Sequence, residues 1–419
     1  MAAPHVVIIG GGFGGLFGAR AFKGAPVEVT LVDRHNHHVF QPLLYQVATA
    51  GLSPGDIASP IRWILRRQKN VRVLLGEVQA IDVASRRVLL DGAESLTYDY
   101  LIVAAGADNS YFGHPEWAQF APALKTLDDA LRVRGRMLLA YEVAEREADP
   151  AVRRRMLTSV IVGGGPTGVE MAGAIAEIAH QTLSDEFQSI HTAESRIVLA
   201  EAGPSILSAF PDTLRNAARK SLQTLGVEVR EKTAVTRVEH EAVWLGEERI
   251  EAGTIIWAAG VAASTLGKSL GVPVDRAGRV LVQKDLTIPG HPEVFVVGDL
   301  ASLTDENGQP YPGVAQVAMQ QARQAARNVI RAVERQPPAE FHYKNLGNMA
   351  TIGRNAAIAD LGWLRVSGFL AWLLWLFIHI FWLIGFRNRI LVLVQWAGAY
   401  VTYQRSVRLI TGNLSRKDL

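Results

Sequence analysis

The sequence of 419 residues contains no cysteine. This absence excludes a structural disulfide, a thiolate metal site and any reaction that passes electrons through a pair of thiols. The remaining composition is that of a globular protein, with 49% hydrophobic residues. A chain of this length is long enough to bury sizeable cores, and it predicts two or three domains.

Acidic residues are scarce near the C-terminus. Residues 361–419 carry seven Arg and Lys residues against one acid, Asp418, which gives a net charge of +6 and leaves −3 for residues 1–360. The basic residues flank apolar runs and form no polar stripe, so we expect no nucleic-acid partner. An anionic lipid surface, contacted through residues 365–410, fits this charge better.

The N-terminal stretch MAAPHVVIIGGG lacks a basic n-region, a separate apolar segment and a cleavage site. These are the features of a secretory signal peptide. We therefore expect the catalytic part of the chain to stay in the cytoplasm.

Two glycine-rich motifs stand directly after runs of β-branched residues. VVIIGGGFGG (residues 6–15) and SVIVGGGPTGVE (residues 159–170) both contain the pattern GxGxxG. A buried strand, a tight turn and the start of a helix form the context in which this pattern binds a dinucleotide. One such motif alone is a weak signal, because glycine-rich turns are common.

The segments that follow the two motifs are also alike. Each has a helical pattern, a strand that ends in an acid (Asp33 or Glu201), short alternating strands, and an apolar strand that ends in Ala-Ala-Gly. Gly10 and Gly106 are 96 residues apart, and Gly163 and Gly260 are 97 apart. The sequence therefore predicts two dinucleotide-binding domains of one design.

The residue types suit a dinucleotide in both copies. Glycine lets the backbone approach a pyrophosphate at a helix N-terminus, where free N–H groups favour an anion. The acid at the end of the second strand can accept hydrogen bonds from ribose hydroxyls and repel a 2′-phosphate. Glu201 follows Gly163 by 38 residues, so an insertion around LSDEFQSIHTAES must intervene. A solvated acid at a strand end is the alternative for Glu201.

A protein with two dinucleotide sites can hold a flavin and a nicotinamide, since one passes a hydride to the other. HPEVFVVGDL (291–300) predicts another apolar strand, with which the first domain resumes after the second. Four motifs are more specific than these features: FQPLLYQVATAGLSP (40–54), NSYFG (109–113), AQVAMQQ (315–321) and SGFLAWLLWLFIHIFWLIGFRNR (367–389). With these motifs the chain resembles the type II, non-proton-pumping NADH:quinone oxidoreductases over essentially its whole length. The resemblance implies an α/β fold of two Rossmann-like domains, bound FAD, NADH as substrate, a membrane quinone as acceptor and a homodimer.

The same resemblance implies the site residues. The FAD residues are Gly10, Gly12, Phe13, Gly14, Gly15, Asp33, Arg34, Gln41, Pro42, Thr49, Val78, Ala105, Gly106, Gly298, Asp299 and Ala315. The NADH residues are Gly163, Gly165, Pro166, Thr167, Gly168, Glu201, Ala259 and Gly260. The expected catalytic residues are Glu170, Gln316 and Gln320, and no metal site is expected.

Three of these assignments have plain alternatives. Gln316 and Gln320 share a helix face by their spacing and could steer a quinone carbonyl, or they could simply contact water. Glu170 is expected in the first turn of its helix, where it could relay a proton or could be an acid favoured by the helix dipole.

The histidines of HNHH (35–38) are expected in a loop, and His379 in a core or at an interface.

The apolar tail allows two membrane arrangements. Val366 to Phe386 is 21 residues without a formal charge, and one helix of that length would reach about 32 Å, enough for a ~30 Å hydrocarbon core. Arginines follow the run, however, so a single span would leave the NADH site outside. Aromatic residues spread along the tail favour the interface, and we expect a peripheral or monotopic association with the cytoplasmic face of a bacterial inner (plasma) membrane.

The sequence thus predicts a respiratory NADH:quinone oxidoreductase. The predicted boundaries are 1–122 and 271–340 for the FAD domain, 123–270 for the NADH domain, and 341–419 for a C-terminal apolar helical membrane anchor. Two alternatives stay open. One is a soluble-acceptor NADH:flavin oxidoreductase of the same fold, and the other is a non-catalytic, membrane-tethered nucleotide sensor.

Overall fold

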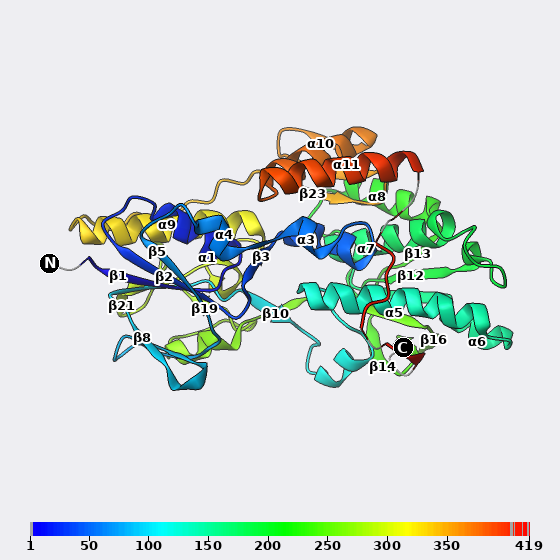
Figure 1. Ribbon diagram of the computed structural model, residues 1–419, viewed down its shortest axis with the longest axis horizontal. Coiled ribbons are helices and arrows are strands. Elements are labelled where there is room, and N and C mark those ends of the chain that lie inside the picture. Colours follow the sequence, from blue (N-terminus) through cyan, green and yellow to red (C-terminus); the bar gives the residue numbers. More distant parts are fainter. Residues whose placement is uncertain (1–2, 403–404, 406, 413, 417–418) are drawn as a thin grey trace. The chain divides into compact units, whose positions relative to one another are not determined.

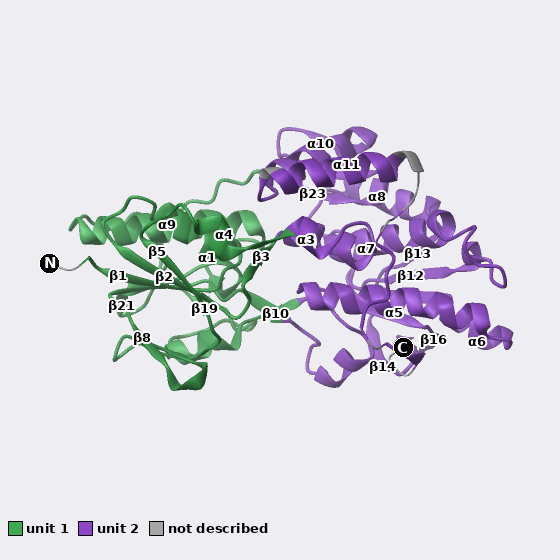
Figure 2. Ribbon diagram, in the orientation of Figure 1, with its two compact units in different colours: residues 1–39, 58–108, 261–346 green, residues 40–57, 109–260, 347–419 purple. Residues whose placement is uncertain are grey.

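The computed structural model describes residues 3–402, 405, 407–412, 414–416 and 419. The chain forms two compact units (Figure 2). Unit 1 comprises residues 1–39, 58–108 and 261–346, and unit 2 comprises residues 40–57, 109–260 and 347–419. Tyr403, Lys417 and Asp418 of the tail lie outside the described residues.

The core of unit 1 is a six-stranded sheet in the order β20-β21-β9-β1-β2-β5. Strands β1, β2, β5, β9 and β21 run parallel, and β20 pairs antiparallel at one edge. Helix α1 packs against α9 along this sheet (Figure 1). The bounds are β1 His5–Ile9, α1 Phe13–Ala21, β2 Glu28–Asp33, β5 Val71–Leu75, β9 Tyr100–Val103, β20 Thr287–Ile288, β21 His291–Val296 and α9 Ala315–Val333.

Smaller elements complete unit 1. A three-stranded antiparallel sheet, β6-β7-β8, packs with the main sheet around a buried apolar cluster that includes Val7, Val88 and Val296. The bounds are β3 His37–Val39, β4 Ala58–Pro60, α4 Ile61–Leu65, β6 Val78–Asp82, β7 Arg87–Leu90, β8 Ser95–Thr97, β19 Val280–Leu281 and β22 Ala301–Ser302.

Unit 2 repeats the design with a four-stranded parallel sheet in the order β13-β12-β11-β17. It also has a three-stranded antiparallel sheet, β14-β15-β16. The bounds are β11 Thr158–Val162, α7 Pro166–Glu177, β12 Arg196–Ala200, α8 Asp212–Thr224, β13 Val227–Arg230, β14 Val235–Glu239, β15 Ala242–Leu245, β16 Glu248–Glu251 and β17 Thr254–Trp257. The order β9-β1-β2-β5 in unit 1 matches β17-β11-β12-β13, so the predicted duplication is confirmed.

The rest of unit 2 comes from distant parts of the sequence. The sheet β23-β24-β25 packs against α10, α7 and α8, and α2 contacts both α5 and α7. The bounds are α2 Leu44–Ala48, α3 Pro54–Ile57, α5 Leu127–Arg146, α6 Pro150–Met156, β23 Asn348–Thr351, β24 Ala357–Asp360, β25 Arg365–Gly368, α10 Phe369–Trp382 and α11 Phe386–Thr402. Residues 347–362, which precede the apolar tail, thus contain the strands β23 and β24.

The predicted continuous helix from Val366 to Phe386 is wrong. The first residues of the run belong to β25, and Gly368 has a positive φ of 76° at the start of α10. Leu383 is extended and Gly385 has φ 94°, which ends α10 after Trp382. At ~1.5 Å per residue, the 14 residues of α10 reach only about 21 Å. Within the described residues, no helix combines the length and apolarity that a membrane crossing requires.

Candidate functional site

The first glycine loop connects β1 to α1 in unit 1. Gly10 has φ 96°, and a Cβ atom there would lie 2.4 Å from the carbonyl oxygen of Ala104. A Cβ at Gly15 would lie 1.6 Å from the carbonyl oxygen of Gly10. Gly12 caps α1 without a side-chain hydrogen bond, and no atom lies within 4 Å of its Cβ position. The first turn of α1 therefore presents backbone N–H groups beside open space.

The second loop repeats this geometry between β11 and α7. Gly163 has φ 108°, and a Cβ at Gly168 would lie 1.8 Å from the carbonyl oxygen of Gly163. Gly165 caps α7, again without a side-chain cap and with open space at its Cβ position. Pro166 and Thr167 are the first two residues of α7. Both loops thus need glycine for conformation and for close backbone contact.

The two predicted ribose acids also correspond. Asp33 ends β2, and its carboxylate accepts hydrogen bonds from the backbone N–H of Gly11 and, at 2.6 Å, from that of His35. Glu201 directly follows β12 and accepts from the N–H of Gly164 and of Gly203, both at 2.6 Å. Each acid therefore fixes the glycine loop of its own domain. The alternative of a merely solvated Glu201 does not fit these two bonds.

The other predicted FAD residues divide between the units. Unit 1 holds Phe13, Gly14, Arg34, Val78, Ala105, Gly106, Gly298, Asp299 and Ala315, whereas Gln41, Pro42 and Thr49 belong to unit 2. Arg34 forms an exposed ion pair with Asp108 at 3.6 Å. The N–H of Gly298 donates to the side chain of Gln321 at 2.7 Å, which ties the turn after β21 to α9. The predicted return of the chain to the first sheet through β21 is confirmed.

Ala259 and Gly260 follow β17 in unit 2. Gly260 has φ 103°, and a Cβ there would lie 2.8 Å from the ring of Phe112, which is 68% exposed. Phe112 belongs to the predicted motif NSYFG, and the N–H of Ser110 in that motif donates to the carbonyl oxygen of Gly260 at 3.2 Å. The motif therefore covers the end of the strand that carries the predicted nicotinamide residues.

Gln316 and Gln320 lie one turn apart on α9, as predicted from their spacing. The Oε1 of Gln316 accepts from the hydroxyl of Tyr343 and from the N–H of Leu346, each at 3.2 Å. Gln320 donates to the carbonyl of Lys344 and accepts from its N–H, both at 2.9 Å. These amides hold the segment 343–346 against α9, so the alternative in which they contact only water is wrong.

Glu170 is the fifth residue of α7, so the prediction of a first-turn position is wrong by one residue. Its side chain is only 9% exposed. Burial raises the pKa of Glu170 to about 8, although a hydrogen bond from the backbone of Thr351 lowers it in part. A buried carboxyl that titrates near neutral pH can hold and release a proton. A solvated acid at a helix end would not have this property.

Glu170 lines a cavity of about 120 Å³ within unit 2. The walls come from α2, α7, β23 and the C-terminal helices α10 and α11. Aromatic side chains supply much of the surface, and a few polar groups converge on the interior. The lining includes Tyr45, Gln46, Glu177, Thr351, Arg354, Trp372, Trp375, Trp396, Tyr400 and Arg405. An aromatic cavity with few polar groups is typical of a small-molecule site.

Of two further histidines, His38 is buried and His379 is partly buried. His38 lies in β3, so the prediction that all of HNHH is loop is wrong for His37 and His38. The Nδ1 of His38 lies 3.0 Å from the carbonyl oxygen of Gly11, and burial lowers the pKa of His38 to about 4. His379 bonds the carbonyl oxygen of Trp375 at 2.8 Å, and burial lowers its pKa to about 4 as well. His379 is therefore the satisfied histidine that was expected.

Several tail arginines have protein partners. Arg405 pairs with Glu177 at 2.9 Å, Arg408 with Glu186 at 2.6 Å, and Arg416 with Glu147 at 3.1 Å. Arg365 pairs with Asp360 at 3.5 Å. Sequence reasoning missed these partners, because each acid in the first three pairs lies more than 200 residues before its arginine. These ion pairs therefore attach the tail to the rest of unit 2.

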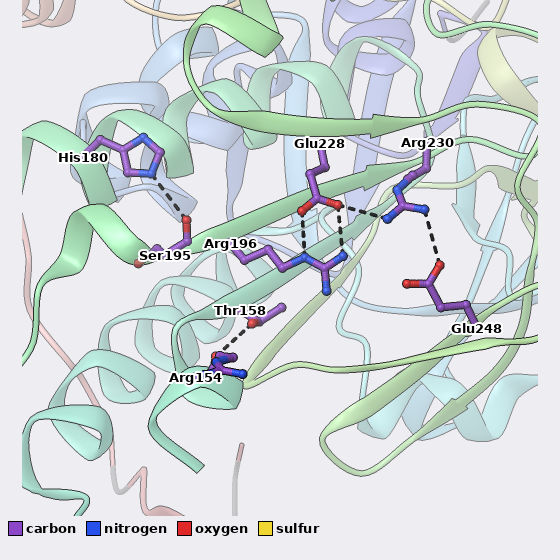
Figure 3. Close-up of polar contacts among 8 residues, drawn as sticks. All are labelled: Arg154, Thr158, His180, Ser195, Arg196, Glu228, Arg230 and Glu248. Carbon is purple, nitrogen blue, oxygen red and sulfur yellow. Dashed lines mark hydrogen bonds and ion pairs between the residues drawn. The ribbon is translucent and has the colours of Figure 1, made fainter. Parts of the chain in front are cut away.

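A polar network joins the strands of the second sheet (Figure 3). Glu228 of β13 accepts two bonds from Arg196 of β12, at 2.8 and 3.0 Å, and one from Arg230 at 3.2 Å. Arg230 also donates to Glu248 of β16 at 3.3 Å. The hydrogen bonds from Arg196 lower the pKa of Glu228. None of the predicted site residues belongs to this network, and its exposed pairs stabilise the fold only weakly.

Two Rossmann-type folds in one chain, the first interrupted by the second, define a protein with two dinucleotide-binding domains. Comparison with known families agrees. Residues 4–322 match the family described as pyridine nucleotide-disulphide oxidoreductase, and residues 345–403 match the one described as the NDH2 C-terminal domain. Because the chain has no cysteine, a disulfide takes no part in its chemistry.

Individual relatives narrow the assignment. The chain is 49% identical to the type II NADH:quinone oxidoreductase NdhA of Mycobacterium tuberculosis, over 98% of this chain and 90% of the relative. It is 46% identical to Ndh of the same organism, over 97% and 90%. The structure of NDH2 from Plasmodium falciparum in complex with NADH has a similar fold, with a TM-score of 0.88, 20% identity, and coverage of 98% of this chain and 100% of the other. The chain belongs to the type II NADH:quinone oxidoreductase family.

Proposed function

We propose that this protein oxidises NADH and reduces a membrane quinone through bound FAD, without pumping protons. One observation carries the proposal. Glu170, a buried carboxyl with a pKa of about 8, stands on the helix that follows the second glycine loop and lines an aromatic cavity. The second glycine loop thus offers a site for the nicotinamide nucleotide. A few residues further along the chain, Glu170 can hold a proton beside a cavity that suits an apolar electron acceptor.

The residues present fit both dinucleotides. In each glycine loop the helix N-terminus is uncapped by a side chain, and the Cβ positions of Gly12 and Gly165 face open space, where a pyrophosphate would bind. We assign FAD to the first loop and NADH to the second. The corresponding domains are 1–122 with 271–340 for FAD and 123–270 for NADH. The remaining predicted FAD and NADH residues keep these assignments.

The chemistry of electron transfer belongs to the flavin, which accepts a hydride from NADH and passes two electrons to a quinone when it is bound. The protein positions the reactants and supplies protons. Glu170 is protonated below pH ~8, so it can give a proton to a quinone oxygen and take another from solvent. The aromatic walls of the cavity exclude water and suit a planar ring. Gln316 and Gln320 are proposed to contact the quinone as well.

The C-terminal helices are proposed to hold the enzyme at the membrane surface. Phe369, Leu370, Phe377 and Phe381 of α10 are between 47% and 69% exposed, and Leu393 and Val394 of α11 are also exposed. A soluble surface rarely presents so many large apolar side chains on two adjacent helices. A monotopic anchor on the cytoplasmic face of a bacterial plasma membrane, aided by the exposed Arg387 and by a homodimer contact, accounts for them.

The test separates the two half-reactions. NADH is expected to bleach the flavin absorbance of the purified protein, and a short-chain quinone is expected to restore it. A protein that is bleached but is not re-oxidised by quinone would be the soluble-acceptor oxidoreductase, and one that is not bleached would be the nucleotide sensor.

Membrane association has its own test. Membranes washed in alkaline carbonate should release the activity; full retention would argue for a spanning segment.

A further inference from the structure

The middle residue of the first glycine loop is held at both of its backbone groups. The N–H of Gly11 donates to the carboxylate of Asp33, and the carbonyl oxygen of Gly11 lies 3.0 Å from Nδ1 of His38. A Cβ atom at Gly11 would lie 2.3 Å from the side chain of Ile61, so the loop also packs closely against α4. Asp33 is one of the proposed FAD residues, but His38 is not.

The contact with Gly11 determines which nitrogen of His38 carries the proton. A carbonyl oxygen can only accept, so Nδ1 must be the donor. Burial lowers the pKa of His38 to about 4, so the ring is neutral and Nε2 has a lone pair. Among the described residues this buried Nε2 has no hydrogen-bond partner. A buried acceptor without a partner destabilises a fold, so the ring has no advantage in stability over an apolar side chain. Its useful group is therefore the Nδ1–H.

The same hydrogen bond sets the direction of a neighbouring N–H group. The peptide between Gly11 and Gly12 is trans, and in a planar trans peptide the C=O and N–H bonds point in opposite directions. Because the carbonyl of Gly11 points to His38, the N–H of Gly12 points away from it. Gly12 is the N-cap of α1, and no atom lies within 4 Å of its Cβ position. His38 thus orients a donor at the helix N-terminus where a pyrophosphate is proposed to bind.

The second glycine loop is held in the same two places. The N–H of Gly164 donates to Glu201 at 2.6 Å, and the carbonyl oxygen of Gly164 accepts from the backbone N–H of Leu207 at 2.7 Å. Leu207 has φ 52°, a conformation that is uncommon for a residue other than glycine. Both domains thus supply a donor to the corresponding carbonyl, by an imidazole in one and by a strained backbone in the other. The repetition indicates that the loop needs this donor.

We propose that His38 is a positioning residue for FAD, which holds the peptide between Gly11 and Gly12 so that the N–H of Gly12 faces the pyrophosphate. The inference rests on the assignment of FAD to the first loop, and it concerns the binding of the flavin only. Without the Nδ1–H donor this peptide is less ordered, and FAD must order it on binding, which lowers the affinity. The NADH loop keeps its own donor from Leu207 and is not affected.

The donor can be removed with little change in shape. Asparagine places its Nδ2 where histidine has Nδ1, so His38→Asn keeps a donor for Gly11. Leucine branches at the same atom as asparagine and is of similar size, but it has no donor. Both variants lose the ring and its edge contact with Phe13, at 5.0 Å between ring centroids. The difference between His38→Leu and His38→Asn therefore reports on the hydrogen bond.

The affinity for FAD is measured on the full-length, FAD-loaded proteins. Dilution releases the flavin, and the rise in flavin fluorescence gives the Kd. His38→Leu is expected to bind FAD about tenfold more weakly than His38→Asn, the ratio that one neutral hydrogen bond can supply. Circular dichroism of the flavin-free proteins should show that His38→Leu melts no lower than His38→Asn. The KM for NADH, measured with excess FAD, should be the same in the parent and in both variants.

The outcomes separate the possible errors. Equal FAD affinities in His38→Leu and His38→Asn, or a lower melting temperature of flavin-free His38→Leu that accounts for its loss of FAD, would overturn the role of His38. The proposed function would then still stand. A higher KM for NADH in His38→Leu with unchanged FAD affinity would overturn the assignment of the two nucleotides to the two loops. The bleaching of the parent by NADH and its re-oxidation by quinone test the proposed function independently of these variants.

Discussion

The carboxylate of Glu201 accepts a hydrogen bond of 2.6 Å from the backbone N–H of Gly164. Asp33 makes the corresponding bond to Gly11 in the other domain. In both copies the acid at the end of the second strand thus holds the glycine loop in place. On the assignment proposed above, the selectivity for the nucleotide would depend on the same side chain.

Glu201→Gln is expected to narrow the preference for NADH over NADPH. The variant removes the negative charge that repels a 2′-phosphate. It also places an amide NH₂, which can only donate, against one of the two backbone N–H groups that now donate to the carboxylate. We expect the ratio of kcat/KM for NADH to that for NADPH to fall about tenfold, equivalent to about 1.4 kcal/mol. Asp33→Asn is the control, since it changes the other loop. An unchanged ratio in Glu201→Gln would defeat the assignment of this acid to the ribose.

Gln316→Leu is expected to slow re-oxidation by quinone and to leave bleaching by NADH intact. The substitution removes the acceptor for Tyr343 and Leu346, so it also loosens the segment 343–346. Tyr343→Phe provides the comparison, because it breaks the same contact with Tyr343 and leaves the glutamine amide in place. If both variants slow re-oxidation equally, Gln316 acts by holding this segment and does not contact the quinone.

Much of the fold could be predicted because its signals are local. The glycine loops, the strand-end acids and the two groups of alternating strands are each visible within about a dozen residues, and the duplication made each signal stronger. The break in the tail also had a local signal in Gly385, but the surrounding apolar residues concealed it. Apolar runs indicate burial or lipid and do not by themselves fix where a helix ends.

The contacts that build the cavity had no such signal. Gln46 and Trp396 are 350 residues apart, and Glu177 and Arg405 are 228 apart. Neither spacing has a periodicity that a sequence reveals, since both depend on how the C-terminal helices pack on unit 2. The net charge of the tail follows from counting its residues, but such a count does not show which acids pair with the tail arginines.

Arg405→Met is expected to destabilise the protein by about 3 kcal/mol. Glu177 is 8% exposed, and burial raises its pKa although the charge of Arg405 lowers it. Without the arginine a buried carboxylate is left without its charge partner. The double variant Glu177→Gln with Arg405→Met should recover much of the loss, which denaturant unfolding of the FAD-loaded protein can measure. A double variant as unstable as the single one would show that the pair is not coupled.

Glu170→Gln is expected to change the pH dependence of stability. The pKa of Glu170 is about 8 in the folded protein and lies near 4.5 in the unfolded chain, so the folded state binds the proton more tightly. The stability that this group contributes is complete below pH ~4.5 and is lost as the pH rises through about 8. Glutamine does not titrate, so the variant should melt close to the parent at about pH 5 and above it at about pH 9. If the Tm of the variant differs from that of the parent by the same amount at both pH values, Glu170 is already ionised in the folded protein at neutral pH. It could not then be the proton donor.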